Sequence, residues 1–256
     1  EQAEIYRQVF EPFGGRRVVV RTLDAGADKP LAFADLGAEE NPALGRRGLR
    51  LSAERPDLLD AQLEALAIAA ADTGADVRVM APMVALTEEA AWFARRVREN
   101  GLKSVGVMIE VPGAALRARH VLEEVDFGSL GTNDLAQYTM AADRMQGELA
   151  DLLDPWQPAL LDVVATAGEG AAVNGKPMGV CGESAGDPLL ALVLTGLGVT
   201  SLSMAPSKVA MVRYALSQHT FAQCQRLAHV ARSARTAQEA REAVLAGAAP
   251  AVTALL

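Results

Sequence analysis

The sequence predicts an α/β protein with parallel strands, best described as a (β/α)8 barrel of the TIM type. Short apolar runs alternate with helical segments, and polar residues follow several of these runs. An open doubly wound sheet is the competing architecture. No Gly-x-Gly-x-x-Gly motif follows the first predicted strand, which counts against the dinucleotide-binding form of that sheet.

Six short runs of apolar and β-branched residues predict strands covered on both faces, as in a parallel sheet. They are residues 17–23, 77–83, 105–111, 126–132, 176–183 and 200–206. A complete barrel of this type needs eight strands. Either two strands escape this count, or they precede Glu1.

The segments between the strands have helical periodicity. In residues 57–70 the apolar side chains fall on one helical face, at Leu59, Leu63, Leu66 and Ala70. Residues 87–100 open with Thr87, the expected N-cap, and carry acidic residues in the first turn and arginines in the last. The alanine-rich chain from about residue 208 onward predicts the last barrel helix and additional C-terminal helices.

Composition restricts the partners. The net charge is −8 and the cationic residues are scattered, which argues against a nucleic-acid surface and an anionic membrane. No apolar run approaches the length of a membrane span. Two cysteines without a C-x-x-C motif predict a reducing, cytoplasmic location. The three histidines lack metal-ligand spacing.

Two carboxylates follow predicted strands, Glu110 after "GVMI" and Asp134 after "SLGTN". Burying one carboxylate is costly, and two at neighbouring strand ends repel each other. Mg²⁺ resolves this conflict, because it binds one or two carboxylates and takes substrate oxygens and waters as its other ligands. The alternative is that each carboxylate caps a helix or pairs with a nearby arginine.

Three arginines, Arg21, Arg47 and Arg144, are predicted to bind an anionic ligand, because the guanidinium fork matches carboxylate and phosphate oxygens. Structural salt bridges at the barrel mouth are the alternative. Cys181 directly follows a strand in "VCGES", where a thiol can donate a proton or act as a nucleophile. Cys224, within a helical segment, is expected to be inert packing.

Together these groups predict a small polyanionic ligand, held by arginines, chelated to a divalent metal and protonated or deprotonated by a thiol. An enolate with carboxylate and phosphate groups fits this description.

The stretch "SLGTNDLAQYTMAADR" (129–144) closely resembles the signature of the phosphoenolpyruvate-utilising enzymes. Six further blocks resemble the C-terminal domain of that family in the same order, over about residues 1 to 215. They are "RTLDAGADK" (21–29), "ENPALGRRGLR" (40–50), "MAPM" (80–83), "GVMIEVPGAA" (106–115), "VCGESAGDP" (180–188) and "SLSMAPS" (201–207). Within the family, "QYTMAADR" is most similar to enzyme I of the sugar phosphotransferase system.

The resemblance implies a role for each site residue. Glu110 and Asp134 match the Mg²⁺ ligands. The arginines that match the phosphate and carboxylate contacts of phosphoenolpyruvate are Arg21 and Arg144, with Arg47 a further active-site arginine. Asn133 matches another substrate contact, and Cys181 matches the acid that protonates enolpyruvate to pyruvate.

The resemblance also implies what this chain lacks. The family barrel has two strands before "VVVRT", which accounts for the count of six, and the N-terminal phosphohistidine and HPr-binding domains have no counterpart here. We therefore expect residues 1–256 to form one phosphoenolpyruvate-binding barrel domain, a piece of a dimeric transferase that moves phosphate to its own histidine and then to HPr.

Two alternatives remain. One is a Mg²⁺-dependent lyase of the aldolase or citrate-lyase type, which also binds a pyruvate enolate but lacks the thiol of "CGE". The other is a non-catalytic fragment that binds ligands or only dimerises.

Overall fold

The computed structural model describes residues 1–26, 31–34 and 37–255. The chain forms two compact units. The first comprises residues 1–108 and 124–126, and the second comprises residues 109–123 and the chain from residue 127 onward. The last three residues of the predicted block 21–29 lie outside the described residues.

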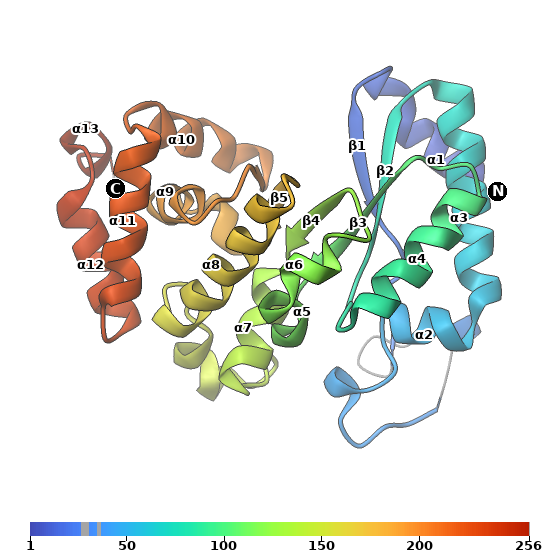
Figure 1. Ribbon diagram of the computed structural model, residues 1–256, viewed down its shortest axis with the longest axis horizontal. Helices are drawn as coiled ribbons and strands as arrows, with labels where there is room; N and C mark the ends of the chain where they lie inside the picture. The colour runs from blue at the N-terminus through green and yellow to red at the C-terminus, as the bar shows by residue number, and fades with distance from the viewer. Residues whose placement is uncertain (27–30, 35–36, 256) are drawn as a thin grey trace. The chain divides into compact units, whose positions relative to one another are not determined.

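The first unit contains three parallel strands in chain order, β1, β2 and β3, with helices between them. Its elements are α1 (Gln2–Phe10), η1 (Glu11–Phe13), β1 (Arg17–Arg21), η2 (Ala32–Ala34), η3 (Pro42–Leu44), α2 (Leu49–Glu54), α3 (Pro56–Thr73), β2 (Asp76–Ala81), α4 (Thr87–Glu99) and β3 (Ser104–Ile109). In Figure 1 this unit runs from blue to green, with α1 packed along α3.

The apolar face predicted for the long helix is confirmed. Leu59, Leu63 and Leu66 of α3 are at most 2% exposed. The predicted N-cap of α4 is wrong, because the helix is capped by Leu86 and Thr87 is its first residue. The Glu89 carboxylate accepts hydrogen bonds from the backbone N–H groups of Ala85 and Leu86, which fixes the chain just before the helix.

The second unit contains three more parallel strands in chain order, β4, β5 and β6. Its elements are α5 (Pro112–Leu116), α6 (Ala118–Val121), β4 (Phe127–Leu130), α7 (Thr132–Met140), η4 (Gly147–Leu153), α8 (Pro158–Val173), β5 (Met178–Cys181), η5 (Glu183–Gly186), α9 (Pro188–Gly196), β6 (Ser201–Ser203), α10 (Pro206–Ser217), α11 (Phe221–Ser233), α12 (Ala237–Gly247) and α13 (Pro250–Thr253). The C-terminal helices, orange to red in Figure 1, include α11, which packs on α9 and α12.

The two faces of this second set of strands differ in chemistry. Leu130 of β4 is in register with Val180 of β5, and both are buried. Ser129 is in register with Gly179, so the alternate positions present small or polar residues on the opposite face. At these positions one face carries the buried pair Leu130 and Val180, and the other carries the small residues Ser129 and Gly179.

The backbone of helix α8 packs directly against the backbone of the turn after α9. A Cβ atom on Gly168 would lie 2.0 Å from the carbonyl oxygen of Leu197, in the turn after α9. No side chain fits at that separation. Glycine at this position therefore sets the distance between α8 and this turn.

The predicted α/β class is confirmed, and all six predicted strands are present. Each described strand is followed by helical structure, which is the repeat of a (β/α)8 barrel. The expected helices after residue 208 are also present. Among the described residues, no helix is both long enough and apolar enough to span a membrane.

We expect Gly168→Ala to destabilise the second unit by about 1–3 kcal/mol, because the new methyl group meets a backbone oxygen that cannot move away. Alanine in a helix interior normally has the opposite effect. Urea unfolding followed by Trp156 fluorescence in a Trp92→Phe background measures the change. Glu169→Ala, at the exposed neighbouring position, is the matched control, and equal stability of the two variants would contradict the packing argument.

Candidate functional site

Two predicted arginines of the first unit meet at one carboxylate. Arg47 donates two hydrogen bonds to Asp24, from Nε to Oδ1 at 3.3 Å and from Nη2 to Oδ2 at 2.9 Å. Arg21, the last residue of β1, donates from Nη1 to Asp24 Oδ2 at 3.3 Å. Asp24 therefore holds both guanidinium groups at the end of β1.

This cluster is largely buried. The side chains of Arg47 and Asp24 are each 1% exposed, whereas that of Arg21 is 42% exposed. Removing the charged Arg47 and Asp24 side chains from water is costly. Loss of either side chain would break this buried ion pair and leave the charge of the other less well compensated. Arg46, next in the chain, instead bonds Glu39 and lowers the pKa of that carboxyl below its usual value.

The second unit carries the remaining predicted residues. Glu110, which follows β3, is 1% exposed. Asn133 and Asp134 lie in the first turn of α7, after β4 ends at Leu130. Asp134 is buried, and its Oδ2 lies 3.5 Å from Nη1 of Arg144. The positive end of the helix dipole adds to the field that stabilises this carboxylate.

Arg144 reaches Asp134 because the chain reverses after α7. The helix ends at Met140, and its C-cap Ala141 adopts the left-handed conformation with φ 51°. Buried Gln137 then accepts a hydrogen bond from the backbone N–H of Arg144 at 2.9 Å. The spacing of Gln137 and Arg144 in the signature therefore has a local structural cause.

The turns after β4 and β5 interlock. A Cβ atom on Gly182 would lie 2.3 Å from Oγ1 of Thr132, so only glycine permits this approach. The hydroxyls of Thr132 and Ser184 share a hydrogen bond of 2.7 Å. These contacts bring the chain that carries Cys181 against the first turn of α7.

Cys181 is the last residue of β5, is half-buried and forms no disulfide. Its thiol contacts β4, where the Ser129 hydroxyl donates to Sγ at 3.0 Å. Cys224 is buried in α11, and burial raises the pKa of its thiol. The two cysteines therefore occupy the different environments that the sequence predicted.

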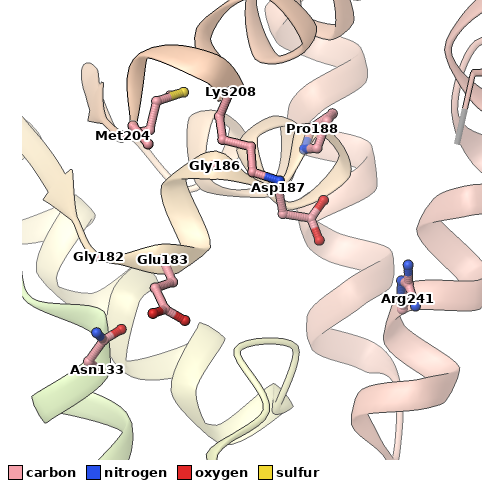
Figure 2. Close-up of a pocket in the computed structure, with 10 residues that line it drawn as sticks. Asn133, Gly182, Glu183, Gly186, Asp187, Pro188, Met204, Lys208 and Arg241 are labelled. Atoms are coloured by element: carbon pink, nitrogen blue, oxygen red, sulfur yellow. The ribbon is translucent and has the colours of Figure 1, made fainter.

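Two cavities open beside these turns, both lined by Asn133 and Glu183. The smaller, of about 300 Å³, also includes Arg144 and Ser184 in its lining. The larger, of about 700 Å³, extends toward Lys208 and Arg241. Figure 2 shows the side chains of Asn133 and Glu183 at one side of this space and Arg241 at the other.

The described residues contain no cluster of three or more His, Cys, Asp or Glu side chains arranged as metal ligands. A Mg²⁺ site does not require one, because one or two carboxylates with ligand oxygens and waters suffice. Glu110 and Asp134 are buried carboxylates in the same unit. These hard oxygen donors fit Mg²⁺.

Sequence reasoning missed the residues that hold the predicted groups. Asp24 lies three residues after Arg21, and that acidic residue in "RTLD" was the available signal. Ser129, Thr132 and Gln137 lie in the stretch 129–144, and Ser184 lies in the block 180–188, but the sequence gave none of them a role. The hydrogen bond between Thr132 and Ser184 joins segments that are distant in the sequence.

We expect Asp24→Ala to destabilise the first unit by about 3–5 kcal/mol, because it removes the carboxylate that pairs with buried Arg47. Urea unfolding followed by Trp92 fluorescence in a Trp156→Phe background measures this. Asp57→Ala removes the partner of Arg55 in an exposed pair and should leave the unfolding midpoint nearly unchanged. Similar midpoints for the two variants would show that the fork does not stabilise this unit.

Comparison with known proteins gives consistent matches. A phosphoenolpyruvate-protein phosphotransferase of Streptomyces coelicolor is 59% identical over 91% of this chain and 42% of its own length. Another of that name, from Haloferax volcanii, is 42% identical over 89% of this chain and 43% of its own length. The chain thus spans less than half of these relatives.

A solved HpcH/HpaI aldolase from Desulfitobacterium hafniense covers 70% of this chain and 72% of its own, at 14% identity and a TM-score of 0.38, too low to support an argument. The family model described as "PEP-utilising enzyme, PEP-binding domain" matches residues 1–221. The chain therefore belongs to the phosphoenolpyruvate-binding domain family of the phosphoenolpyruvate-utilising enzymes.

Proposed function

We propose that this chain binds phosphoenolpyruvate with Mg²⁺ and supports transfer of its phosphoryl group to a protein histidine, releasing pyruvate. In this proposal the chain is the C-terminal part of an enzyme I, a phosphoenolpyruvate-protein phosphotransferase. The names of the relatives and the family match support the assignment.

One observation carries the proposal. Gly182 packs against Thr132, and Thr132 bonds Ser184, so the turn after Cys181 is fixed against the helix whose first turn contains Asn133 and Asp134. A candidate acid and a candidate metal ligand are thereby carried by two interlocked turns of one unit. Protonation of an enolate held by a metal requires these two kinds of group near each other.

We assign Glu110 and Asp134 as the residues that would hold Mg²⁺. The bound ion would supply positive charge that stabilises an enolate oxygen. Arg144 lines the smaller cavity together with Asn133, so its guanidinium can bind an anion there. Asn133 lines both cavities and offers an amide to the substrate.

The assignment of Arg21 and Arg47 rests on the sequence blocks 21–29 and 40–50, which resemble those of the family. We assign Arg21, together with Arg144, to the phosphate and carboxylate oxygens, for which the guanidinium fork is suited, and Arg47 as a further active-site arginine. Asp24 fixes the orientation of Arg21 and Arg47 before the ligand binds. Fixed cations stabilise the charge that develops as the phosphoryl group leaves, without reorganisation during the reaction.

Cys181 is the proposed acid. After the phosphoryl group has gone to the acceptor histidine, the enolate carbon takes a proton from Sγ. The electron pair of the carbon–carbon double bond forms the new C–H bond, the S–H bond breaks, and the carbonyl of pyruvate forms. The resulting thiolate regains a proton from solvent.

The wider assignment follows the relatives. We propose that residues 1–256 form one barrel domain whose first two strands, and the domain with the acceptor histidine, belong to a longer protein. HPr would take the phosphate next, in sugar transport. We also propose that the protein is a cytoplasmic homodimer. The two free cysteines agree with a reducing compartment.

We expect oxalate, a mimic of enolpyruvate, to bind this chain only when Mg²⁺ is present, because its oxygens complete the coordination of the ion. Isothermal titration calorimetry with and without Mg²⁺ measures this. Asp134→Ala should abolish the heat of binding, whereas Asp143→Ala, at an exposed position of the same signature, should retain it.

Oxalate binding that persists without Mg²⁺, or in Asp134→Ala, would contradict the metal assignment. If this chain does not bind oxalate, the same titration is made on the full-length gene product. Binding there would show that the remaining barrel strands complete the site, and absence of binding there would overturn the proposal.

We expect Cys181→Ala to slow exchange of the methyl protons of pyruvate with D₂O by about 10²–10⁴-fold, because that exchange uses the same proton transfer in reverse. Proton NMR of the full-length gene product with Mg²⁺ measures the rate. Cys224→Ala is the matched control and should leave it unchanged. Undiminished exchange in Cys181→Ala would favour a lyase of the aldolase type.

A further inference from the structure

The larger cavity of the second unit carries two cations that the proposed function does not use. Its volume of about 700 Å³ lies within the range of small-molecule sites. Lys208 of α10 and Arg241 of α12 contribute to its lining, and both residues are exposed. Neither forms an ion pair with another residue in the part of the chain that the structure describes. These two cations therefore offer an anion-binding surface on a chain whose net charge is −8.

The position of Lys208 is unfavourable unless an anion lies nearby. This lysine is in the first turn of α10, at the positive end of the helix dipole, where a further positive charge raises the electrostatic energy. Its side chain crosses the turn before α9 at close range, because a Cβ atom on Gly186 would lie 3.3 Å from Cγ of Lys208. A bound anion in the cavity would offset the cost of placing the ammonium group here.

The two carboxylates that line the cavity differ in their surroundings. Oδ1 of Asp187 accepts hydrogen bonds from two backbone N–H groups at the start of α9, at 2.8 and 3.1 Å. Its Oδ2 accepts a hydrogen bond from Nε1 of buried Trp156 at 3.3 Å. Asp187 thus holds the fold together. Glu183 is exposed, and its side chain has no hydrogen bond or ion pair within the described residues.

The polar groups that remain are distributed around the space. Figure 2 shows Asn133 and Glu183 at one side, Arg241 at the other, and Lys208 along the edge between them. The two cations match a phosphate monoester, which carries about two negative charges at neutral pH and whose oxygens accept hydrogen bonds from both side chains. The carboxylate of Glu183 accepts hydrogen bonds only, so it suits hydroxyl groups of a ligand.

We propose that the larger cavity binds a phosphate monoester that also carries hydroxyl groups, such as a sugar phosphate. Lys208 and Arg241 bind the phosphate, and Glu183 accepts hydrogen bonds from the hydroxyl groups. None of these three residues belongs to the proposed phosphoenolpyruvate chemistry, and Arg241 lies outside residues 1–221, which the family model matches. Binding here therefore requires neither Mg²⁺ nor Asp134.

Isothermal titration calorimetry of the full-length gene product, in EDTA and without Mg²⁺, tests this site. The probes are glucose 6-phosphate, inorganic phosphate and glucose. We expect glucose 6-phosphate to bind most tightly and glucose to give no heat of binding, because the phosphate supplies the charge and the hydroxyl groups add further contacts. Lys208→Gln and Arg241→Gln should each raise the Kd for glucose 6-phosphate about tenfold or more, the effect of losing one hydrogen bond between charged groups.

Two further variants separate the site from general effects of charge. Arg213→Gln is the matched control, because it removes one positive charge from an exposed position of α10 outside the cavity lining. It should leave the Kd unchanged. Glu183→Ala should reduce the advantage of glucose 6-phosphate over inorganic phosphate, because it removes the acceptor for the hydroxyl groups. All of these side chains are exposed, so the substitutions leave the core intact.

Each other outcome overturns the inference. Absence of binding, or a native Kd in either Lys208→Gln or Arg241→Gln, would show that the two cations do not hold the phosphate together. An equal loss of affinity in Arg213→Gln would reduce the effect to net charge, and an unchanged advantage in Glu183→Ala would exclude the hydroxyl contacts. Displacement of glucose 6-phosphate by oxalate with Mg²⁺ would place both ligands in one site. The proposed function is tested separately, by the oxalate titration of Asp134→Ala.

Discussion

The close approach of Gly182 to Thr132 is the constraint on which the second unit's site depends. The turn after β5 can lie against the first turn of α7 only because residue 182 has no side chain, since a Cβ atom would lie 2.3 Å from the threonine oxygen. The hydrogen bond from Thr132 to Ser184 then holds the two turns together. The thiol of Cys181 and the carboxylate of Asp134 are thus carried by segments that cannot separate without breaking this contact.

The buried carboxylates of the two units are paired with arginines in different ways. In the first unit, buried Asp24 supports two arginines and leaves one of them partly exposed. In the second unit, Asp134 is buried at a helix N-terminus with Arg144 beside it at 3.5 Å. Buried ion pairs contribute little net stability but fix orientation, because separating the partners leaves an uncompensated charge. Orientation is what recognition of a polyanion requires.

The sequence singled out candidate chemical groups but not the side chains that hold them. Arg21, Asp134 and Cys181 became candidates because each lies at or just after the end of an apolar strand, where burying a polar residue is costly. Asp24 and Ser129 could not be assigned a role in this way. Their partners are defined by side-chain directions across strands and loops, which a linear pattern does not encode.

The sequence by itself determined the alternation of strands and helices, the amphipathic face of α3 and the residue types at the strand ends, because these depend on local periodicity and on the cost of burying polar groups. The tertiary structure alone decided that the Ser129 hydroxyl meets the Cys181 sulfur and that Gly182 is required beside Thr132. It also decided that Leu86, and not Thr87, is the N-cap of α4, with its backbone N–H bonded to Glu89. Each of these depends on distances between atoms that the chain brings together only when its strands pair and its helices pack.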